Sequence, residues 1–200
     1  MDKTETIAKY AGMMSRLPYD TGENPRILLK HENRCYETAA GADFGAIKAA
    51  DIADVTDFDS IEKDVLMASK ETNAMVISKP PYIGICIDSK KTIHAVLDDM
   101  AQIVGRQVRV VPYTTKDIAK ALKGAEAVMI RGGYVITCGR NLYEAYVAMT
   151  VLEKSAEVLL KSAVLGGSVP LSTVDANLMR QVYKRKYSKA EKEHKDDSEG

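Results

Sequence analysis

A glycine-centred hairpin followed directly by a long helix is the feature that most constrains the fold of this chain. Two short apolar runs, 127–130 and 135–138, flank Gly132-Gly133, which is typical of an antiparallel β-hairpin with a tight turn. Asn141 then opens a predicted helix that runs through Val164 and that Gly166-Gly167 ends. A hairpin of this kind indicates that the sheet is not purely parallel.

Strands and helices alternate through the middle of the chain. Ala74–Ser78 is typical of a buried strand, and Pro80-Pro81 interrupts it because proline cannot donate a ladder hydrogen bond. A second strand is predicted over Ile83–Ile87. Asp88 or Ser89 can cap a following helix with one apolar face, 89–104, which Gly105 ends. The next predicted elements are a strand at 108–111 and a helix at 115–123.

The two ends of the chain are less regular. Near the N-terminus the sequence favours three short helices, at 4–14, 46–55 and 60–70, and an apolar run at 27–29. A last helix is predicted from Ser172, fraying after Tyr187, and the end of the chain is charged and almost without apolar residues. We therefore predict one domain over residues 1–183 and a disordered, solvated tail over 184–200. The pattern as a whole predicts a mixed sheet flanked by helices.

Composition limits the classes of function. Lysine plus arginine and aspartate plus glutamate number 28 each, so charge gives no reason to expect nucleic acid or an anionic membrane as a partner. No apolar run approaches the roughly 20 residues that span a bilayer, and the N-terminus lacks the apolar centre of a secretory signal. Three widely spaced cysteines are typical of reduced, buried thiols, so a cytoplasmic location is predicted.

Several segments, in this order, resemble the class II aldolase/adducin family. Residues 131–145, RGGYVITCGRNLYEA, are similar to the family's R-N-H-G-V-L-V-V-G-x-x-L-x-E-A, and residues 74–82, AMVISKPPY, resemble its A-V-V-H-T-H-P-P-Y. Ser60-x-Glu62 before Leu66 resembles the start of the helix that carries the family's catalytic glutamate. The loop 41–46 resembles the segment before that helix. Taken together, the resemblance covers roughly residues 7–180.

The resemblance implies a fold and an assembly. The fold is an α/β, three-layer α/β/α arrangement around a mixed, largely antiparallel central sheet. Members commonly form fourfold-symmetric tetramers with active sites between subunits, so a homo-oligomer is expected here.

The resemblance also implies that the metal centre of catalytic relatives is missing. Those relatives bind a divalent metal, usually zinc, through the two histidines of H-x-H and the histidine of N-H-G, and the metal polarises a carbonyl group. The corresponding residues here are Ile77, Lys79 and Gly133, none of which is a zinc ligand. No cofactor is therefore expected. The remaining histidines are His31, His94 and His194.

Two residues are candidates for catalysis without a metal. Glu62 stands where the family has its proton-transferring glutamate, and the alternative is an exposed carboxylate in the first turn of a helix, which the helix dipole favours. Lys79 stands at a ligand position and could form a Schiff base with a carbonyl substrate. The alternative for Lys79 is a surface lysine beside the Pro-Pro turn.

Five further residues are candidates for contact with a ligand. Ser15 ends the sequence Gly12-Met13-Met14-Ser15, which resembles the family's phosphate-binding G-N-x-S without its asparagine. Gly132 and Gly133 could approach a ligand with bare backbone, although a hairpin turn also explains them. Ser60 and Tyr82 lie in the two other segments that resemble the family.

Three functions remain open at this stage. The first, which we prefer, is a non-catalytic oligomeric protein or a protein that binds a small metabolite similar to a sugar phosphate. The second is a metal-independent carbon–carbon lyase (an aldolase) or isomerase on sugar phosphates or related carbonyl compounds, through Lys79 or Glu62. The third is a subunit that pairs with a catalytic paralogue and contributes one side of a shared site.

Overall fold

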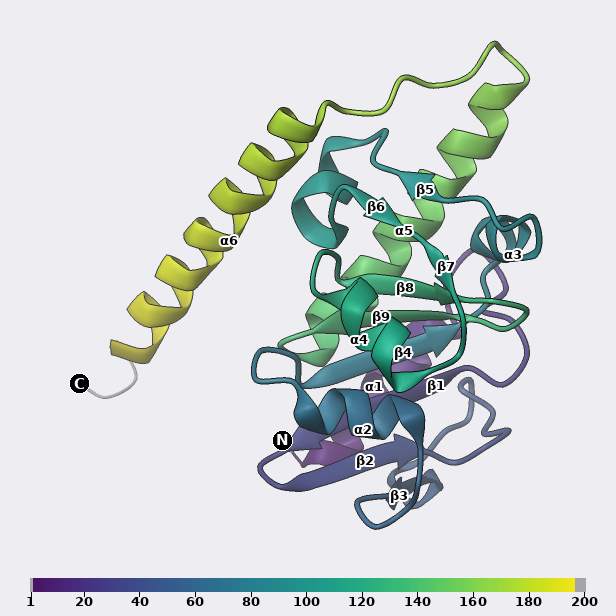
Figure 1. Cartoon of the computed structure of the whole chain (residues 1–200). Coiled ribbons are helices and arrows are strands. Elements are labelled where there is room, and N and C mark those ends of the chain that lie inside the picture. The colour runs from purple at the N-terminus through teal and green to yellow at the C-terminus, as the bar shows by residue number, and fades with distance from the viewer. Residues whose placement is uncertain (1, 197–200) are drawn as a thin grey trace.

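The structure, a computed structural model, describes residues 2–196, and for residues 186–196 it describes only the course of the backbone. A sheet lies at the centre with helices on both faces, and the last helix extends along one side (Figure 1). The helices are α1 (Lys3–Met14), α2 (Ile61–Ala68), α3 (Pro81–Asp88), α4 (Thr115–Leu122), α5 (Leu142–Ala163) and α6 (Thr173–Asp196), with a 3₁₀ turn at Ala49–Asp51 and a π-helix at Met100–Val104. The strands are β1 (Arg26–His31), β2 (Arg34–Thr38), β3 (Ile52–Asp54), β4 (Ala74–Ser78), β5 (Ile93–His94), β6 (Gln107–Val108), β7 (Val110–Val111), β8 (Ala127–Ile130) and β9 (Val135–Gly139).

The main sheet is mixed and largely antiparallel, as predicted. Its seven strands follow the order β3-β2-β1-β4-β9-β8-β7. Neighbours are antiparallel except β7 and β8, which are parallel. The register places Ile77 of β4 between Arg26 of β1 and Ile136 of β9. A separate ribbon pairs β5 with β6.

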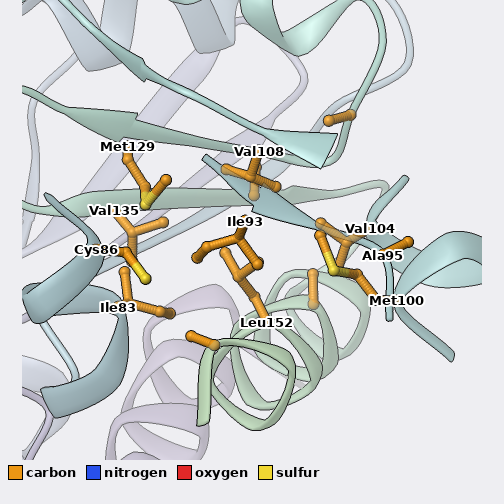
Figure 2. Packing of buried hydrophobic residues seen from close by; sticks show 14 of the residues in the cluster. Ile83, Cys86, Ile93, Ala95, Met100, Val104, Val108, Met129, Val135 and Leu152 are labelled. Atoms are coloured by element: carbon orange, nitrogen blue, oxygen red, sulfur yellow. The ribbon is translucent and has the colours of Figure 1, made fainter. Parts of the chain in front are cut away.

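The helices form two layers, which confirms the predicted α/β/α arrangement. Helices α1, α3 and α5 cover one face of the sheet, and α2 and α4 cover the other (Figure 1). Figure 2 shows the largest apolar cluster, in which Leu152 of α5 lies beside Ile93 of β5, and Met129 and Val135 of the sheet belong to the same cluster. Ile83 of α3 and Met100 of the π-helix close this cluster from the sides. Among the described residues, no helix has the length and apolar character of a membrane span.

The hairpin and the helix after it are confirmed. Strands β8 and β9 are antiparallel, and Gly132 in the turn has a φ of 66°, a conformation that favours glycine. Asn141 caps α5, with its side-chain oxygen accepting a hydrogen bond from the Glu144 amide at 3.0 Å. A Cβ on Gly139 would lie 2.5 Å from the Ala145 nitrogen, so only glycine lets β9 pass this closely to α5.

The predicted strand at Ile83–Ile87 is wrong, because these residues belong to α3. Pro81 occupies the first helical position, where proline loses no helical hydrogen bond and its fixed φ suits the helix. The carboxylate of Glu153, on α5, accepts hydrogen bonds from the Tyr82 and Ile83 amides at 2.9 Å each. This long-range cap satisfies the free amides of the first turn, and no local pattern reveals it.

Other boundaries also differ from prediction. The expected helix at 89–104 is instead β5 followed by the short π-helix, and the expected strand at 108–111 divides into β6 and β7. The segment 46–55 forms a 3₁₀ turn and β3 in place of a helix. Helix α6 begins after Ser172 as predicted but continues to Asp196, beyond the predicted fraying point. The division at residue 183 stays a prediction, and residues 197–200 of the predicted tail lie outside the described part.

Candidate functional site

Glu62 lies at the centre of a buried polar cluster on the α2 side of the sheet. Ser60 caps α2, with its hydroxyl accepting from the Lys63 amide, and this sets Glu62 in the first turn. The residue is only 1% exposed, so the alternative prediction of a solvent-exposed glutamate is wrong. Arg26, the first residue of β1, pairs with Ile77 on the neighbouring strand β4, and its side chain reaches Glu62.

Four side chains donate hydrogen bonds to the Glu62 carboxylate. Arg26 donates from Nη2 to Oε1 at 2.8 Å, and the Tyr134 hydroxyl donates to the same oxygen. The Tyr113 hydroxyl donates to Oε2 at 2.9 Å, and the Ser60 hydroxyl donates to Oε2 at 3.1 Å. A carboxylate offers about four acceptor positions, so this set occupies the acceptor capacity of Glu62.

Arg26 joins a second carboxylate to the cluster. Its Nη1 donates to Glu37 Oε1 at 2.9 Å, so one guanidinium lies between two partly or fully buried carboxylates. The guanidinium lies 5.6 Å from the ring centroid of Tyr134, and the rings of Tyr113 and Tyr134 meet edge to face at 6.4 Å. These contacts connect β1, β2, α2, the β8–β9 turn and the segment before α4.

The environment sets the charge of each group. Burial raises the pKa of Glu62, but the hydrogen bond from Tyr134, that from its own backbone amide and the charge of Arg26 together bring this pKa below its usual value. Burial raises the pKa of Glu37, and Arg26 only partly offsets it. Burial and the hydrogen bond to Glu62 raise the pKa of both tyrosines. At neutral pH Glu62 is therefore an ionised acceptor and the tyrosines are neutral donors.

A family model described as "Class II Aldolase and Adducin N-terminal domain" matches residues 5–160. The chain belongs to the class II aldolase/adducin family. A sequence comparison with curated proteins gives no match.

Solved structures of the class II aldolase/adducin family share the fold. An L-fuculose 1-phosphate aldolase superposes with a TM-score of 0.81 at 19% identity, covering 90% of this chain and 95% of that one. The YgbL protein from Escherichia coli gives a TM-score of 0.75 at 17% identity, with coverages of 88% and 97%. An L-fuculose-1-phosphate aldolase from Thermus thermophilus gives 0.71 at 18% identity, with coverages of 84% and 98%.

The three residues at the positions of the family's metal ligands, Ile77, Lys79 and Gly133, have different surroundings. Ile77 is 1% exposed and belongs to the apolar cluster beneath α2 and α4. The Lys79 ammonium pairs with the Asp88 carboxylate at 3.1 Å, and its side chain is 36% exposed. Gly133 lies in the β8–β9 turn. The described residues include no group of three or more His, Cys, Asp or Glu side chains arranged to hold a metal ion.

The histidines lie in other parts of the fold. His31 ends β1, at the opposite end of that strand from Arg26. His94 lies in the β5–β6 ribbon, and His194 lies in the part of α6 whose side chains are not described.

The predicted ligand-contact residues divide among several places. Ser60 contacts Glu62 in the polar cluster, and Gly132 and Gly133 form the turn that precedes Tyr134. The Tyr82 ring lies on the other side of the sheet, under the Lys161 ammonium, 5.3 Å from it. Whether any of these residues contacts a ligand stays a prediction.

Ser15 lines a small pocket of about 310 Å³. The pocket brings the end of α1 together with the loop at 42–45, two segments that resemble parts of the family. Its charged lining residues are Asp20 and Asp43, and none of the lysines and arginines whose side chains the structure describes lines it. Asp20 and Asp43 each accept a backbone hydrogen bond, from Gly22 and Gly45 respectively.

A larger cleft of about 1120 Å³ separates α6 from the body. Arg180 and Lys184 of α6 line it and pair with Glu126 at 2.9 and 3.2 Å. Neither this cleft nor the pocket at Ser15 is lined by Glu62 or by Lys79.

Sequence reasoning found Glu62 and Ser60 but missed their partners. Arg26 precedes an apolar run and carries no local signal, and Tyr113 lies in a connecting segment. Tyr134 falls within the hairpin segment that resembles the family, so only its position beside the turn could have suggested a role.

Proposed function

We propose that this chain is a non-catalytic member of the class II aldolase/adducin family, which assembles as a homo-oligomer and binds a small polyhydroxylated metabolite. The observation that carries the proposal is the state of Glu62. Its carboxylate is buried and accepts four side-chain hydrogen bonds. A proton-transferring carboxylate needs a substrate within hydrogen-bond reach, and here each acceptor position already has a protein donor.

The residues at the three ligand positions support the same proposal. Zinc in proteins takes cysteine, histidine or carboxylate ligands. Ile77 and Gly133 supply no side-chain donor atom, and the Lys79 ammonium is held against Asp88. We therefore propose that no zinc ion binds here and that this chain does not stabilise an enediolate through a metal.

Metal content and aldol cleavage test this proposal together. The protein, purified without chelators, is analysed for metals by mass spectrometry and assayed for cleavage of L-fuculose 1-phosphate beside an authentic aldolase. We expect zinc well below one ion per chain and no cleavage. Stoichiometric zinc in the purified protein, or cleavage that Glu62→Gln abolishes, would falsify the proposal.

The pocket beside Ser15 supports the nature of the ligand. Asp20 and Asp43 can accept hydrogen bonds from sugar hydroxyl groups, whereas a phosphate would meet two carboxylates and no lysine or arginine among the described lining residues. We therefore propose that the ligand is a neutral, sugar-like metabolite rather than a phosphorylated one.

The two alternative functions have separate tests. Schiff-base chemistry at Lys79 requires a desolvated amine, and the half-exposed ion pair with Asp88 gives this route little support. Borohydride reduction with candidate aldehydes and ketones, followed by mass spectrometry, would reveal an adduct at Lys79 that Lys79→Arg lacks. Pairing with a catalytic paralogue predicts that a second family member co-purifies from the native host.

The cysteines support a reducing location. Cys35, Cys86 and Cys138 are buried and free, and burial raises the pKa of the Cys35 and Cys86 thiols to about 11. We therefore propose that the protein resides in the cytoplasm, and cell fractionation tests this.

A further inference from the structure

Helix α6 is apolar on two opposite faces. Its inner face packs on the protein, with Ala176 1% exposed and Met179 against the main apolar cluster. Arg180 on the same side pairs with Glu126 at 2.9 Å. In Figure 1 most of α6 lies apart from the sheet, and its outer side faces open space.

The outer face carries an aliphatic stripe of three residues. Val174, Leu178 and Val182 are 75%, 59% and 58% exposed. They recur every four residues, so they follow one another along one side of the helix. A residue two positions away is rotated by roughly 200°, which places this stripe opposite Ala176 and Arg180.

An exposed aliphatic stripe of this kind indicates a surface that contacts another molecule. A surface helix normally has one apolar face, turned to the core, and a polar face toward water. Contiguous exposed aliphatic side chains therefore mark contact surfaces. Three spaced aliphatic side chains match the spacing by which one helix packs along another.

We propose that the stripe pairs with the same stripe of a second copy of this chain, with the two α6 helices antiparallel about a twofold axis at Leu178. The stripe is self-complementary in this orientation, because Val174 and Val182 each lie four residues from Leu178. Val174 of one copy therefore meets Val182 of the other, and Leu178 meets Leu178. A twofold contact between identical surfaces is the commonest form of homodimer.

The charges on α6 favour the antiparallel orientation. Asp175 lies in its first turn and Arg185 near the end of its described side chains. In the antiparallel pair these residues of different copies lie about 6 Å apart along the axis, against about 15 Å in a parallel pair. A parallel pair would also place Asp175 beside Asp175, and antiparallel helix dipoles attract each other. The inference rests on the proposed homo-oligomer and adds a twofold contact to it, distinct from the fourfold contacts that the family resemblance implies. It uses neither Glu62 nor the pocket at Ser15.

Site-specific cross-linking tests the register. The native cysteines are buried, so an added surface thiol dominates the reaction. Under mild oxidation, we expect Leu178→Cys to form disulfide-linked dimers and the adjacent exposed control Asn177→Cys to form several-fold fewer. Val174→Cys alone should cross-link poorly, since the two copies of this residue lie about 12 Å apart along the axis. An equimolar mixture of Val174→Cys and Val182→Cys should cross-link well.

Mass in solution tests the contact without a thiol. By light scattering at a fixed micromolar concentration, we expect Leu178→Asp to have half the mass of the wild type and Asn177→Asp to keep the wild-type mass. Circular dichroism verifies that both variants fold. A monomeric wild type, an unchanged mass for Leu178→Asp, or equal cross-linking at 177 and 178 would each overturn the inference. Zinc content and sugar binding are measured separately, so a failure here is distinct from a failure of the proposed function.

Discussion

Replacing Glu62 with glutamine removes one negative charge from the buried cluster while keeping the size of the side chain. The amide nitrogen brings a donor to a place where every neighbour already donates, so at least one of Arg26, Tyr113, Tyr134 and Ser60 loses its acceptor. Breaking a buried ion pair by removing one partner costs about 3–5 kcal/mol. Arg26 keeps Glu37 and is 24% exposed, so the expected loss is smaller, about 2–3 kcal/mol.

Urea unfolding followed by circular dichroism at a fixed protein concentration measures this loss. We expect Glu62→Gln to unfold about 2–3 kcal/mol more easily than the wild type at pH 7. Tyr113→Phe, which removes one hydrogen bond at a half-exposed residue, should lose only about 1 kcal/mol. Glu157→Gln on α5 is the control, because Glu157 pairs with Lys154 and Lys161 at the surface, where ion pairs contribute little.

The stability difference between wild type and Glu62→Gln should also change with pH in a definite direction. Because the pKa of Glu62 is lowered on folding, its contribution is present above its unfolded pKa and is lost as pH falls. The difference between wild type and Glu62→Gln should therefore shrink below about pH 4.5. Equal urea midpoints at pH 7, or a difference that grows toward acid pH, would refute the account of the cluster.

Three further predictions use other parts of the fold. Gly139→Ala should prevent normal folding, because its Cβ would lie 2.5 Å from the Ala145 nitrogen. Gly12→Ala, in the last turn of α1 where a Cβ would meet no other atom within 4 Å, should instead stabilise the protein by about 0.5–1 kcal/mol. Soluble yield and thermal unfolding compare the two variants. Glu153→Gln should lose about 2 kcal/mol and speed hydrogen exchange at the first amides of α3, since one of its two acceptor oxygens becomes a donor; unchanged exchange there would count against the long-range cap. In calorimetric titrations L-fuculose should bind at least as tightly as L-fuculose 1-phosphate, and tighter binding of the phosphate would rule out the neutral ligand proposed for the pocket at Ser15.

The sequence predicted those elements whose signals are local. The turn at Gly132-Gly133 and the cap at Asn141 lie beside the elements they delimit, so the β8–β9 hairpin and α5 could be predicted within a residue or two. The Pro80-Pro81 pair is ambiguous, because two prolines can interrupt a strand or begin a helix. Glu153 settles the choice from 70 positions away, which no local pattern reveals.

The candidate site shows the same limit. The first-turn position of Glu62 indicated an exposed carboxylate, since acidic residues favour helix N-termini. Its burial depends on Arg26, which precedes it by 36 residues, and on Tyr134, which follows it by 72. Lys79 was singled out by its place in a motif, and its contact with Asp88 depends on the helical course of α3, which the sequence did not predict.

The sequence separations within the Glu62 cluster have a consequence for the order of folding. Its contacts with Arg26, Tyr113 and Tyr134 span 36, 51 and 72 residues, so each closes a long loop whose entropy must be lost first. We therefore expect these contacts to form after the rate-limiting barrier, in which case they mainly slow unfolding. Stopped-flow measurements on Glu62→Gln should accordingly show an accelerated unfolding limb and a nearly unchanged refolding rate.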